Sequence, residues 1–371
     1  MTDYSTLSDE ELLKQYRDAN KEVAKYNNFQ MAKKILMNSL YGAMGNEGFR
    51  FFDPRIAEGI TLTGQYFIRA VGSAIDEYIS KLTKEKGEYT FYQDTDSCYV
   101  TLEKIIEKFV LPRLGENCDI HRIIDAMNKI SDDKITPAIN GACDDIASYT
   151  NSIKQLMNFK REALADRGVW TGKKKYALNV YDNEGVRYAE PKTKVMGLEI
   201  VRSSTPAPVR KMLKNAVKIV LEGSEKELQS HIDSWKAEFL AMTPEEIAFP
   251  RGVQNIDNYT DTANIYKKGC PIHVRAALLF NHHVNKNGLG EVYPSIVDGD
   301  KIKFIYLRVP NNVRENVFGF VDKFPRELGI EKYIDYEEMW SKAFLAPLDS
   351  IISTIGWHHK EKATLAGLFD D

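Results

Sequence analysis

Paired cysteines, long apolar runs and a strong net charge are all missing from this sequence of 371 residues. The four cysteines are scattered and form no CxxC pair, which argues against a disulfide framework or a zinc site and favours a reducing compartment. The apolar runs are too short to span a membrane, and MTDYSTLSDEELL lacks the basic and apolar regions of a signal peptide. We therefore expect a cytoplasmic protein without a membrane partner.

The net charge of −3 gives no global sign of nucleic-acid binding, but charge is unevenly distributed along the chain. Residues 154–194 hold ten basic and five acidic residues, a local excess of +5. A solvated charged face explains this excess as well as a polyanion-binding surface does, and the composition leaves both open.

Helical patterns dominate the first 160 residues. Ser8 and Glu11 form a capping box that opens a helical pattern ending at Gly42. Asn27 and Asn28 leave open whether this is one helix or two. A second amphipathic stretch covers residues 60–82, and residues 104–160 are mostly helical in pattern.

Strand and helix signals alternate later in the chain. Residues 168–191 predict a β-hairpin with the turn DNEG, and KIKFIYLRV predicts a strand. Thr205 and Pro206 predict the N-cap and first position of a helix, and Ser224 with Glu227 boxes the next one. Composition divides the chain into three segments, with boundaries near residues 46 and 199.

Two aspartates one residue apart stand between strand-like runs in TFYQDTDSCYVTL. A turn at DT places Asp94 and Asp96 near the tip of a hairpin, where their charges repel each other unless a cation lies beside them. Magnesium commonly takes one or two protein carboxylates and completes its shell with substrate phosphates. An ordinary Asp-rich turn explains the three letters DTD equally well.

The longer strings resemble a known family. YQDTDSCYV resembles the YGDTDS motif of family B DNA polymerases, KKILMNSLYG resembles the K-x-x-x-N-S-x-Y-G helix motif, and TGKKKYALNVYD resembles the K-K-R-Y segment that contacts the primer. The three occur in the family's order. GNEGFRFFDPRIAEGITLTGQ, RYAEPKTKVMGLE, SSTPAPV and KGCPIHVRAAL are similar to the T-even-type phage branch. The sequence is thus identified as a member of this family over essentially its whole length.

The resemblance implies an α+β fold, part of the right-hand polymerase architecture. Residues 1–45 would be the C-terminal part of helical fingers. Residues 46–198 would be the palm, a β-sheet with helices. Residues 199–371 would be a mostly helical thumb that ends in a clamp-binding tail.

One helix face carries the residues that the family uses for the incoming nucleotide. Lys34, Asn38 and Tyr41 share a face, and Gln30 extends it by one turn. The resemblance implies that Lys34 and Asn38 bind the dNTP triphosphate, that Lys34 supplies catalytic charge, and that Tyr41 checks the new base pair. Gly42, which has no side chain, would let the backbone come close to that base pair.

The resemblance also implies two Mg²⁺ ions, with one shared with a partner chain. Asp96 corresponds to the direct metal ligand, Asp94 to a supporting acid and Glu162 to a third acidic position. Lys160 replaces an aspartate of the phage pattern, the following loop is shortened to ADRGVW, and Gln93 replaces the usual glycine. These departures leave the role of Glu162 and the local backbone geometry open.

Contacts with primer-template DNA are implied at three places. Lys173, Lys174, Lys175 and Tyr176 would alternate along a strand that faces the primer. A basic helix face with Arg210, Lys211, Lys214 and Lys218 suits duplex phosphates, although a solvated face is an equal alternative. His273 and Arg275 resemble a phage thumb segment near the duplex. In the tail, Leu365, Leu368 and Phe369 would anchor the chain to a sliding clamp, unless the terminus is simply frayed.

The family's second metal-binding aspartate belongs to a D-x-x-S-L-Y-P-S motif, and this sequence contains no such string. No exonuclease segment is present either. We therefore expect the C-terminal part of a polymerase, active only with an N-terminal chain that supplies both. A split gene and a truncated chain both fit this expectation. The alternative is a non-catalytic remnant that binds DNA or the clamp as an accessory factor.

Overall fold

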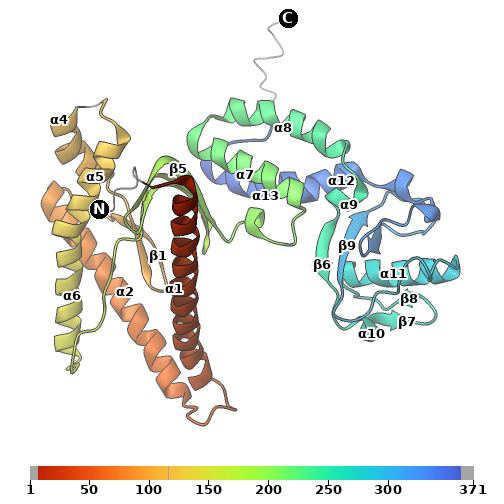
Figure 1. The fold of residues 1–371 in the computed structure, drawn as a ribbon, viewed down its shortest axis with the longest axis horizontal. Helices are drawn as coiled ribbons and strands as arrows, with labels where there is room; N and C mark the ends of the chain where they lie inside the picture. The colour runs from red at the N-terminus through yellow and green to blue at the C-terminus, as the bar shows by residue number, and fades with distance from the viewer. Residues whose placement is uncertain (1–6, 116, 361–371) are drawn as a thin grey trace, which may run out of the picture. The chain divides into compact units, whose positions relative to one another are not determined.

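The structure is a computed structural model that describes residues 7–115 and 117–360. It divides into two compact units, residues 1–160 and 161–371 (Figure 1). Both contain helices and small antiparallel sheets, which confirms the mixed α+β class. Within the described ranges, no helix combines the length and the apolar character needed to cross a membrane.

The first unit begins with one long helix, α1 (Asp9–Met44). The predicted capping box is confirmed, because Ser8 accepts from the backbone of Glu11 while Glu11 accepts from the backbone of Ser8 at 2.9 Å. The two asparagines left open in the sequence do not interrupt the helix. Gly45 follows as its C-cap.

Helix α2 (Pro54–Thr83) contributes to the core of this unit only from Phe67 onward. Asp53 caps it through the backbone N–H of Arg55 at 3.0 Å. The helix packs against α6 (Thr136–Tyr149) and against a hairpin of β1 (Thr90–Asp94) and β2 (Ser97–Val100). Its buried residues recur at helical spacing: Phe67, Ile68, Val71, Gly72, Ile75, Ile79 and Thr83.

Three wide helical turns interrupt otherwise continuous helices, each just before a proline. In the first unit they join α3 (Glu103–Ile105) to α4 (Leu111–Leu114) and α5 (Ile120–Ile130) to α6. Proline has no N–H and its ring clashes with the carbonyl four residues earlier, so the preceding turn widens to a π-type turn. The turns are Ile106–Val110, Ser131–Ile135 and, in the second unit, Ser341–Leu345; the prolines are Pro112, Pro137 and Pro347.

The second unit begins with an antiparallel meander of β3 (Ala163–Gly172), β4 (Lys175–Asn183) and β5 (Val186–Met196). The predicted DNEG turn is confirmed between β4 and β5, with positive φ at Glu184 and Gly185. The first strand of the predicted hairpin, however, is divided between β3 and β4 by a turn at Lys173 and Lys174. Asp182 is buried below this turn and accepts hydrogen bonds from Arg161, Arg187 and the backbone of Gly185.

Helices and a second sheet complete this unit. Strands β6, β9 and β10 form a sheet in the order β10-β9-β6, and α11 packs on β10. The predicted KIKFIYLRV strand is β9. The α-helices and further β-strands of this unit are α7 (Ala207–Glu222), α8 (Glu225–Leu240), α9 (Pro244–Ile247), β6 (Phe249–Gly252), α10 (Ile256–Tyr259), β7 (Thr260–Asp261), β8 (Ile265–Tyr266), α11 (Ile272–Lys286), β9 (Lys301–Tyr306), β10 (Val317–Phe320), α12 (Tyr336–Trp340) and α13 (Ala346–Ile352).

One hydrophobic core runs through the second unit. Its aromatic centre is Trp340, whose ring stacks on Phe344 with centroids 4.3 Å apart and packs against Phe239. Val169 and Ala177 of the meander belong to the same core. The core therefore takes residues from both sides of the boundary expected near residue 199.

The start of α7 differs from the prediction by one residue. Pro206, not Thr205, is the N-cap. The Thr205 hydroxyl is buried and donates to the carbonyl of Glu199 at 3.0 Å, and the helix begins without a side-chain cap at its N-cap residue. The predicted cap of α8 by Ser224 is confirmed.

Candidate functional site

The turn between β1 and β2 is tight and strained. Asp94 pairs with Ser97, which leaves Thr95 and Asp96 as a two-residue loop. Thr95 has a φ of 51°, and the N–H of Asp96 donates to the carbonyl of Asp94 at 2.6 Å. A positive φ is an outlier for a β-branched residue and costs on the order of 1–3 kcal/mol, and such strain concentrates at functional sites.

The two acids at this tip lie in different surroundings. Asp94 is half-buried and accepts from the Thr95 hydroxyl at 2.9 Å, while the Ser97 hydroxyl donates to the Asp94 carbonyl at 3.1 Å. Asp96 is exposed. The geometry therefore holds one carboxylate within the turn and leaves the other accessible to a cation.

The hairpin tip by itself is a partial metal site. Across residues 7–115 and 117–360, no cluster of three or more His, Cys, Asp or Glu side chains could hold a metal ion. Magnesium often takes only one or two protein carboxylates, so Asp96 and Asp94 fit it when other ligands complete the shell.

Glu162, the third acidic position, forms an ion pair in this structure. Its Oε1 lies 2.6 Å from Nζ of Lys194, and more than half of its side chain is exposed. Exposed pairs of this kind contribute about 0–1 kcal/mol, so the contact is easily exchanged for another. A metal-binding role for Glu162 stays a prediction.

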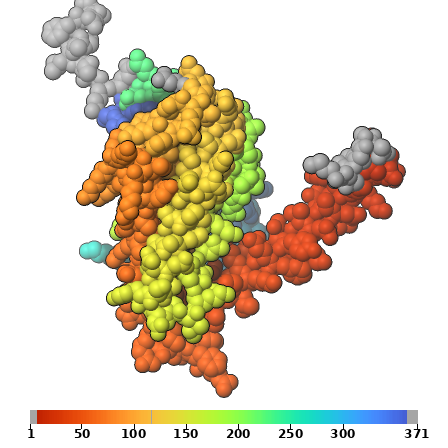
Figure 2. Space-filling model, turned by 90° about the vertical axis from the view of Figure 1, so that its left-hand side faces the viewer, coloured from red at the N-terminus to blue at the C-terminus, as the bar shows by residue number. Residues whose placement is uncertain are grey.

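The nucleotide-binding face predicted on α1 is open to solvent. Gln30, Lys34, Asn38 and Tyr41 are exposed, and a methyl group added at Gly42 would meet nothing within 4 Å. Figure 2 shows α1 extending away from the packed helices of its unit, with α2 meeting it at one end. The face predicted to bind the nucleotide is thus accessible along the helix.

Large apolar side chains are exposed along α1 and the first half of α2. No side chain of α1 is buried, although all of the helix is described. Large exposed apolar side chains in this number are typical of an interaction site. The residues are Leu13, Tyr16, Val23, Tyr26, Phe29, Met31, Ile35, Leu36, Met37 and Leu40 on α1, and Ile56, Ile60, Leu62 and Tyr66 on α2.

The predicted alternation of lysines along a strand is wrong. Gly172 pairs with Lys175, so Lys173 and Lys174 form the turn between β3 and β4, with Lys174 at φ 61°. All three lysines are exposed at this turn. Tyr176 is buried and stacks on Trp170 with ring centroids 5.9 Å apart, which places its ring inside the sheet packing.

The basic face of α7 is exposed as expected of either a DNA-binding or a solvated face. Lys211, Lys214 and Lys218 are exposed and Arg210 is half-buried. Lys218 lies 3.7 Å from Glu222. The opposite face of the helix packs into the core.

On α11, the two predicted DNA-binding residues, His273 and Arg275, both interact with other residues of their own unit. Burial, together with Arg251, lowers the pKa of His273, so its ring is neutral at pH 7. The Arg275 guanidinium donates to Asn316 at 2.8 Å and lies over the ring of Tyr266. Contact of either residue with DNA stays a prediction.

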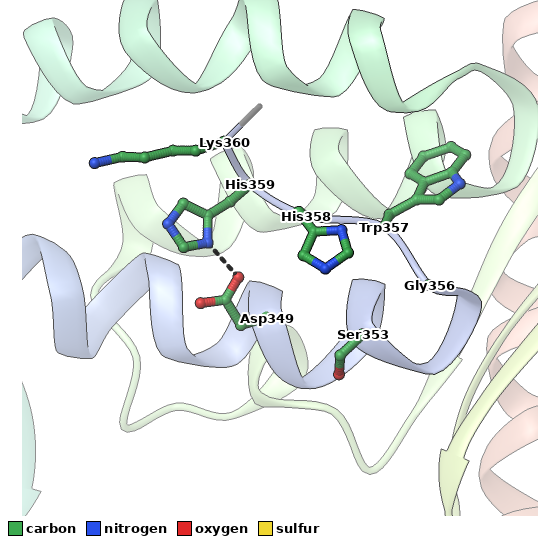
Figure 3. A pocket seen from close by; sticks show the side chains of 7 residues that line it. All are labelled: Asp349, Ser353, Gly356, Trp357, His358, His359 and Lys360. Carbon is green, nitrogen blue, oxygen red and sulfur yellow. Dashed lines mark hydrogen bonds and ion pairs between the residues drawn. The ribbon is translucent and has the colours of Figure 1, made fainter. Parts of the chain in front are cut away.

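A pocket of about 410 Å³ lies where the described chain ends (Figure 3). His359 Nδ1 lies 2.6 Å from Asp349, and the backbone N–H of His358 donates to Glu225 at 2.6 Å. Ser353 points away from both histidines. These contacts hold the chain against α8 and α13. The predicted clamp anchors Leu365, Leu368 and Phe369 lie outside the described residues.

The sequence did not reveal what holds the acidic hairpin on α2. Asp76 Oδ1 accepts from the backbone N–H groups of Tyr89 and Thr90 at 3.0 and 2.7 Å, and Gln93 donates to the carbonyl of Ile68. The two residues of each hydrogen-bonded pair lie 13 to 25 positions apart in the sequence, so no local sequence pattern predicts them. The only signal was that Gln93 departs from the family's glycine.

Comparisons with known proteins agree on one family. Residues 9–118 match the family model described as DNA polymerase family B. The DNA-directed DNA polymerase of Enterobacteria phage T4 is 35% identical over 356 residues, which cover 92% of this chain and 39% of that protein. The corresponding enzyme of Escherichia phage RB69 is 34% identical over 92% of this chain and 38% of its own length. DNA polymerase II of Escherichia coli K12 is 39% identical over 72 residues, 19% of this chain and 8% of that protein. The chain thus spans about two fifths of the phage relatives.

Proposed function

The chain corresponds to a region of the family B DNA polymerases of phages, and we propose that it catalyses DNA synthesis only together with residues outside this sequence. The reaction is template-directed attack of a primer 3′-hydroxyl on the α-phosphorus of a dNTP, with release of pyrophosphate. Its substrates are primer-template DNA and dNTPs. The observation that carries this proposal is the strained hairpin tip, which presents an accessible Asp96 within the motif YQDTDS.

Each set of residues has a separate task in this proposal. Asp96 and Asp94 hold metal at the tip, and any metal-binding role of Glu162 requires that Lys194 release it. Bound Mg²⁺ would activate the primer hydroxyl and neutralise charge on the phosphates. Lys34 and Asn38 bind the triphosphate on the open face of α1. The lysine turn at 173–175 binds phosphates of the primer strand.

A second chain, or a further part of the same protein, completes the enzyme. The missing D-x-x-S-L-Y-P-S motif would supply the second catalytic aspartate, and an exonuclease would come with it. One feature supports the incompleteness. The apolar side chains of α1 are exposed along the whole helix.

Affinity purification of the chain from its native source, followed by mass spectrometry and primer extension, tests this function. We expect a stoichiometric companion that carries the missing motif, extension by the complex, and no extension by the chain alone. Robust extension by the highly purified chain alone would contradict the requirement for a companion. Recovery of only DNA or clamp would favour the accessory-factor alternative.

Asp96→Ala in the same complex tests the assignment of the metal ligand. Extension should fall to background while primer-template binding, measured by fluorescence anisotropy, stays within about twofold, because phosphate contacts dominate DNA affinity. Asp133→Ala removes an exposed carboxylate elsewhere in the same unit and is the matched control. If the Asp96 variant retained activity, the assignment would be wrong.

A further inference from the structure

Gln93 contacts helix α2 from the middle of strand β1. Its Nε2 donates to the carbonyl oxygen of Ile68 at 3.2 Å. Cys98, its cross-strand partner, lies with Sγ 3.8 Å from the same oxygen. Burial raises the pKa of the Cys98 thiol to about 11, although a hydrogen bond from Gln93 opposes the shift, so the thiol stays a donor at neutral pH. Two neighbouring side chains therefore converge on one carbonyl of α2.

Gly72 makes room for this contact. It lies one helical turn after Ile68 and is buried. A methyl group at Gly72 would stand 1.9 Å from Nε2 and 3.2 Å from Cδ of Gln93, and 3.4 Å from Cγ2 of Thr90. Any larger residue at position 72 would thus displace the Gln93 amide. We call the space above Gly72, closed by Gln93 and Thr90, the Gly72 notch.

The notch lies next to the metal-binding tip along the chain but on the other face of the hairpin. Side chains alternate along a strand, so Gln93 and Cys98 face α2 while their neighbours Asp94 and Ser97 face away. Thr95 follows at once with its positive φ. A strained backbone persists only where its surroundings over-determine it, and the notch supplies one such anchor from the β1 side of that turn.

We propose that Gln93, seated in the Gly72 notch, is a positioning residue that fixes the strained turn and thereby the direction of the Asp96 carboxylate. This inference rests on the proposed function, since it is toward the metal that Asp96 must be directed. Gln93 itself touches neither metal nor substrate. It replaces the glycine usual in the motif, and Gly72 supplies the complementary space.

Hydrogen exchange on the full chain tests the contact without requiring activity. Gln93→Ala and Gly72→Ala should each speed amide exchange in β1 and β2 by about tenfold, because each removes the hydrogen bond to Ile68. The double variant should exchange no faster than the faster single variant, since both changes break one contact. Multiplicative effects in the double variant would show that the two residues act independently and would overturn the notch.

Magnesium dependence of the assembled polymerase tests the positioning role. In single-turnover extension, Gln93→Ala should raise the magnesium concentration at half-maximal rate by about tenfold, as for other residues that orient metal ligands, and change the dNTP dependence less. Thr83→Val is the matched control, because it removes a buried hydroxyl that bonds Tyr89 in the same unit, away from the notch. It should leave the magnesium midpoint unchanged.

The outcomes separate this inference from the proposed function. Equal magnesium shifts in the Gln93 and Thr83 variants would mean general destabilisation and would overturn the positioning role. No magnesium-dependent extension by the wild-type assembly would overturn the proposed function and the positioning role with it. The hydrogen-exchange result would still decide whether the notch forms.

Discussion

His283 on α11 is a titratable residue held in an unfavourable setting for its charged form. Burial, then the neighbouring charges of His282 and Lys286, lowers its pKa from 6.5 to about 4. Its ring packs against Phe318, whose strand supports α11. The neutral, half-buried ring therefore packs against the core of the second unit, and protonation must oppose folding.

Stability of the second unit should fall as the pH drops from about 6.5 towards 4. The folded pKa is depressed, so the unfolded chain binds more protons in this window, and stability that is complete above pH 6.5 is progressively lost below it. We expect a loss of about 1–3 kcal/mol from this residue. Urea unfolding followed by tryptophan fluorescence measures it, because all four tryptophans lie in this unit. His283→Asn should flatten the profile, and an unchanged profile would refute the assignment.

Single residues of the acidic turn were predictable in type but not in conformation. The string DTD placed Asp94 and Asp96 at a hairpin tip, and the structure has them there. The positive φ of Thr95 could not be read from the sequence, because threonine rarely adopts it. It arises from the hairpin register, which depends on contacts with α2.

At the scale of elements, the conformation of the lysine turn between β3 and β4 depends on Gly197, the residue that follows β5. Gly197, just after β5, has a φ of 67°, and a methyl group there would lie 2.0 Å from the carbonyl oxygen of Lys174. Backbone cannot give way as a flexible side chain can. The conformation of the turn and the absence of a side chain at position 197 are therefore linked.

Gly197→Ala should destabilise the second unit by about 3 kcal/mol or more, from overlap with backbone and from the positive φ together. Gly172→Ala is the matched control, since a methyl group there meets nothing within 4 Å. It should change stability by less than about 1 kcal/mol. Tryptophan-monitored urea unfolding compares the two. Equal effects would show that the close approach to Lys174 is not what constrains the turn.

Elements were predicted well where their signals are local. The capping box at Ser8, the side-chain cap of α8 by Ser224 and the DNEG turn follow from residues within four positions of each other, and all three are confirmed. The end of β3 and the cap of α7 were missed. The pairing of β3 with β4 ends β3 at Gly172. The Thr205 hydroxyl donates a hydrogen bond to the carbonyl of Glu199. Local patterns carry no record of such distant partners.

At the scale of the whole molecule, residues 150–160 connect the two units with exposed, irregular chain. Ile153 is fully exposed and Leu156 is 77% exposed. Exposed irregular segments are preferred sites of proteolysis. Limited trypsin digestion should therefore cut first after Lys154 or Lys160, and mass spectrometry should find two fragments that correspond to the units.

Lys154→Gln is the control for this digestion, because it should move the first cut to Lys160 without changing the fragments' resistance to further cleavage. First cuts within β3–β5 or α2 would contradict the division into two compact units. The three-segment division drawn from the sequence used composition and resemblance, whereas compactness depends on contacts between distant residues. The two divisions therefore need not coincide.

Helix α1 buries none of its 36 residues. Mutations in this helix can therefore change activity without changing the abundance of the folded protein, two effects that usually occur together. A substitution in a packed helix changes abundance and turnover together, so a lost phenotype has two explanations. On α1, replacements of Lys34, Asn38 or Tyr41 leave the packed cores of this chain untouched. A comprehensive substitution library over this helix could be read out in parallel as soluble yield and as primer extension, the activity proposed for the assembled enzyme. It would be nearly flat in yield, and its map of extension would report recognition alone.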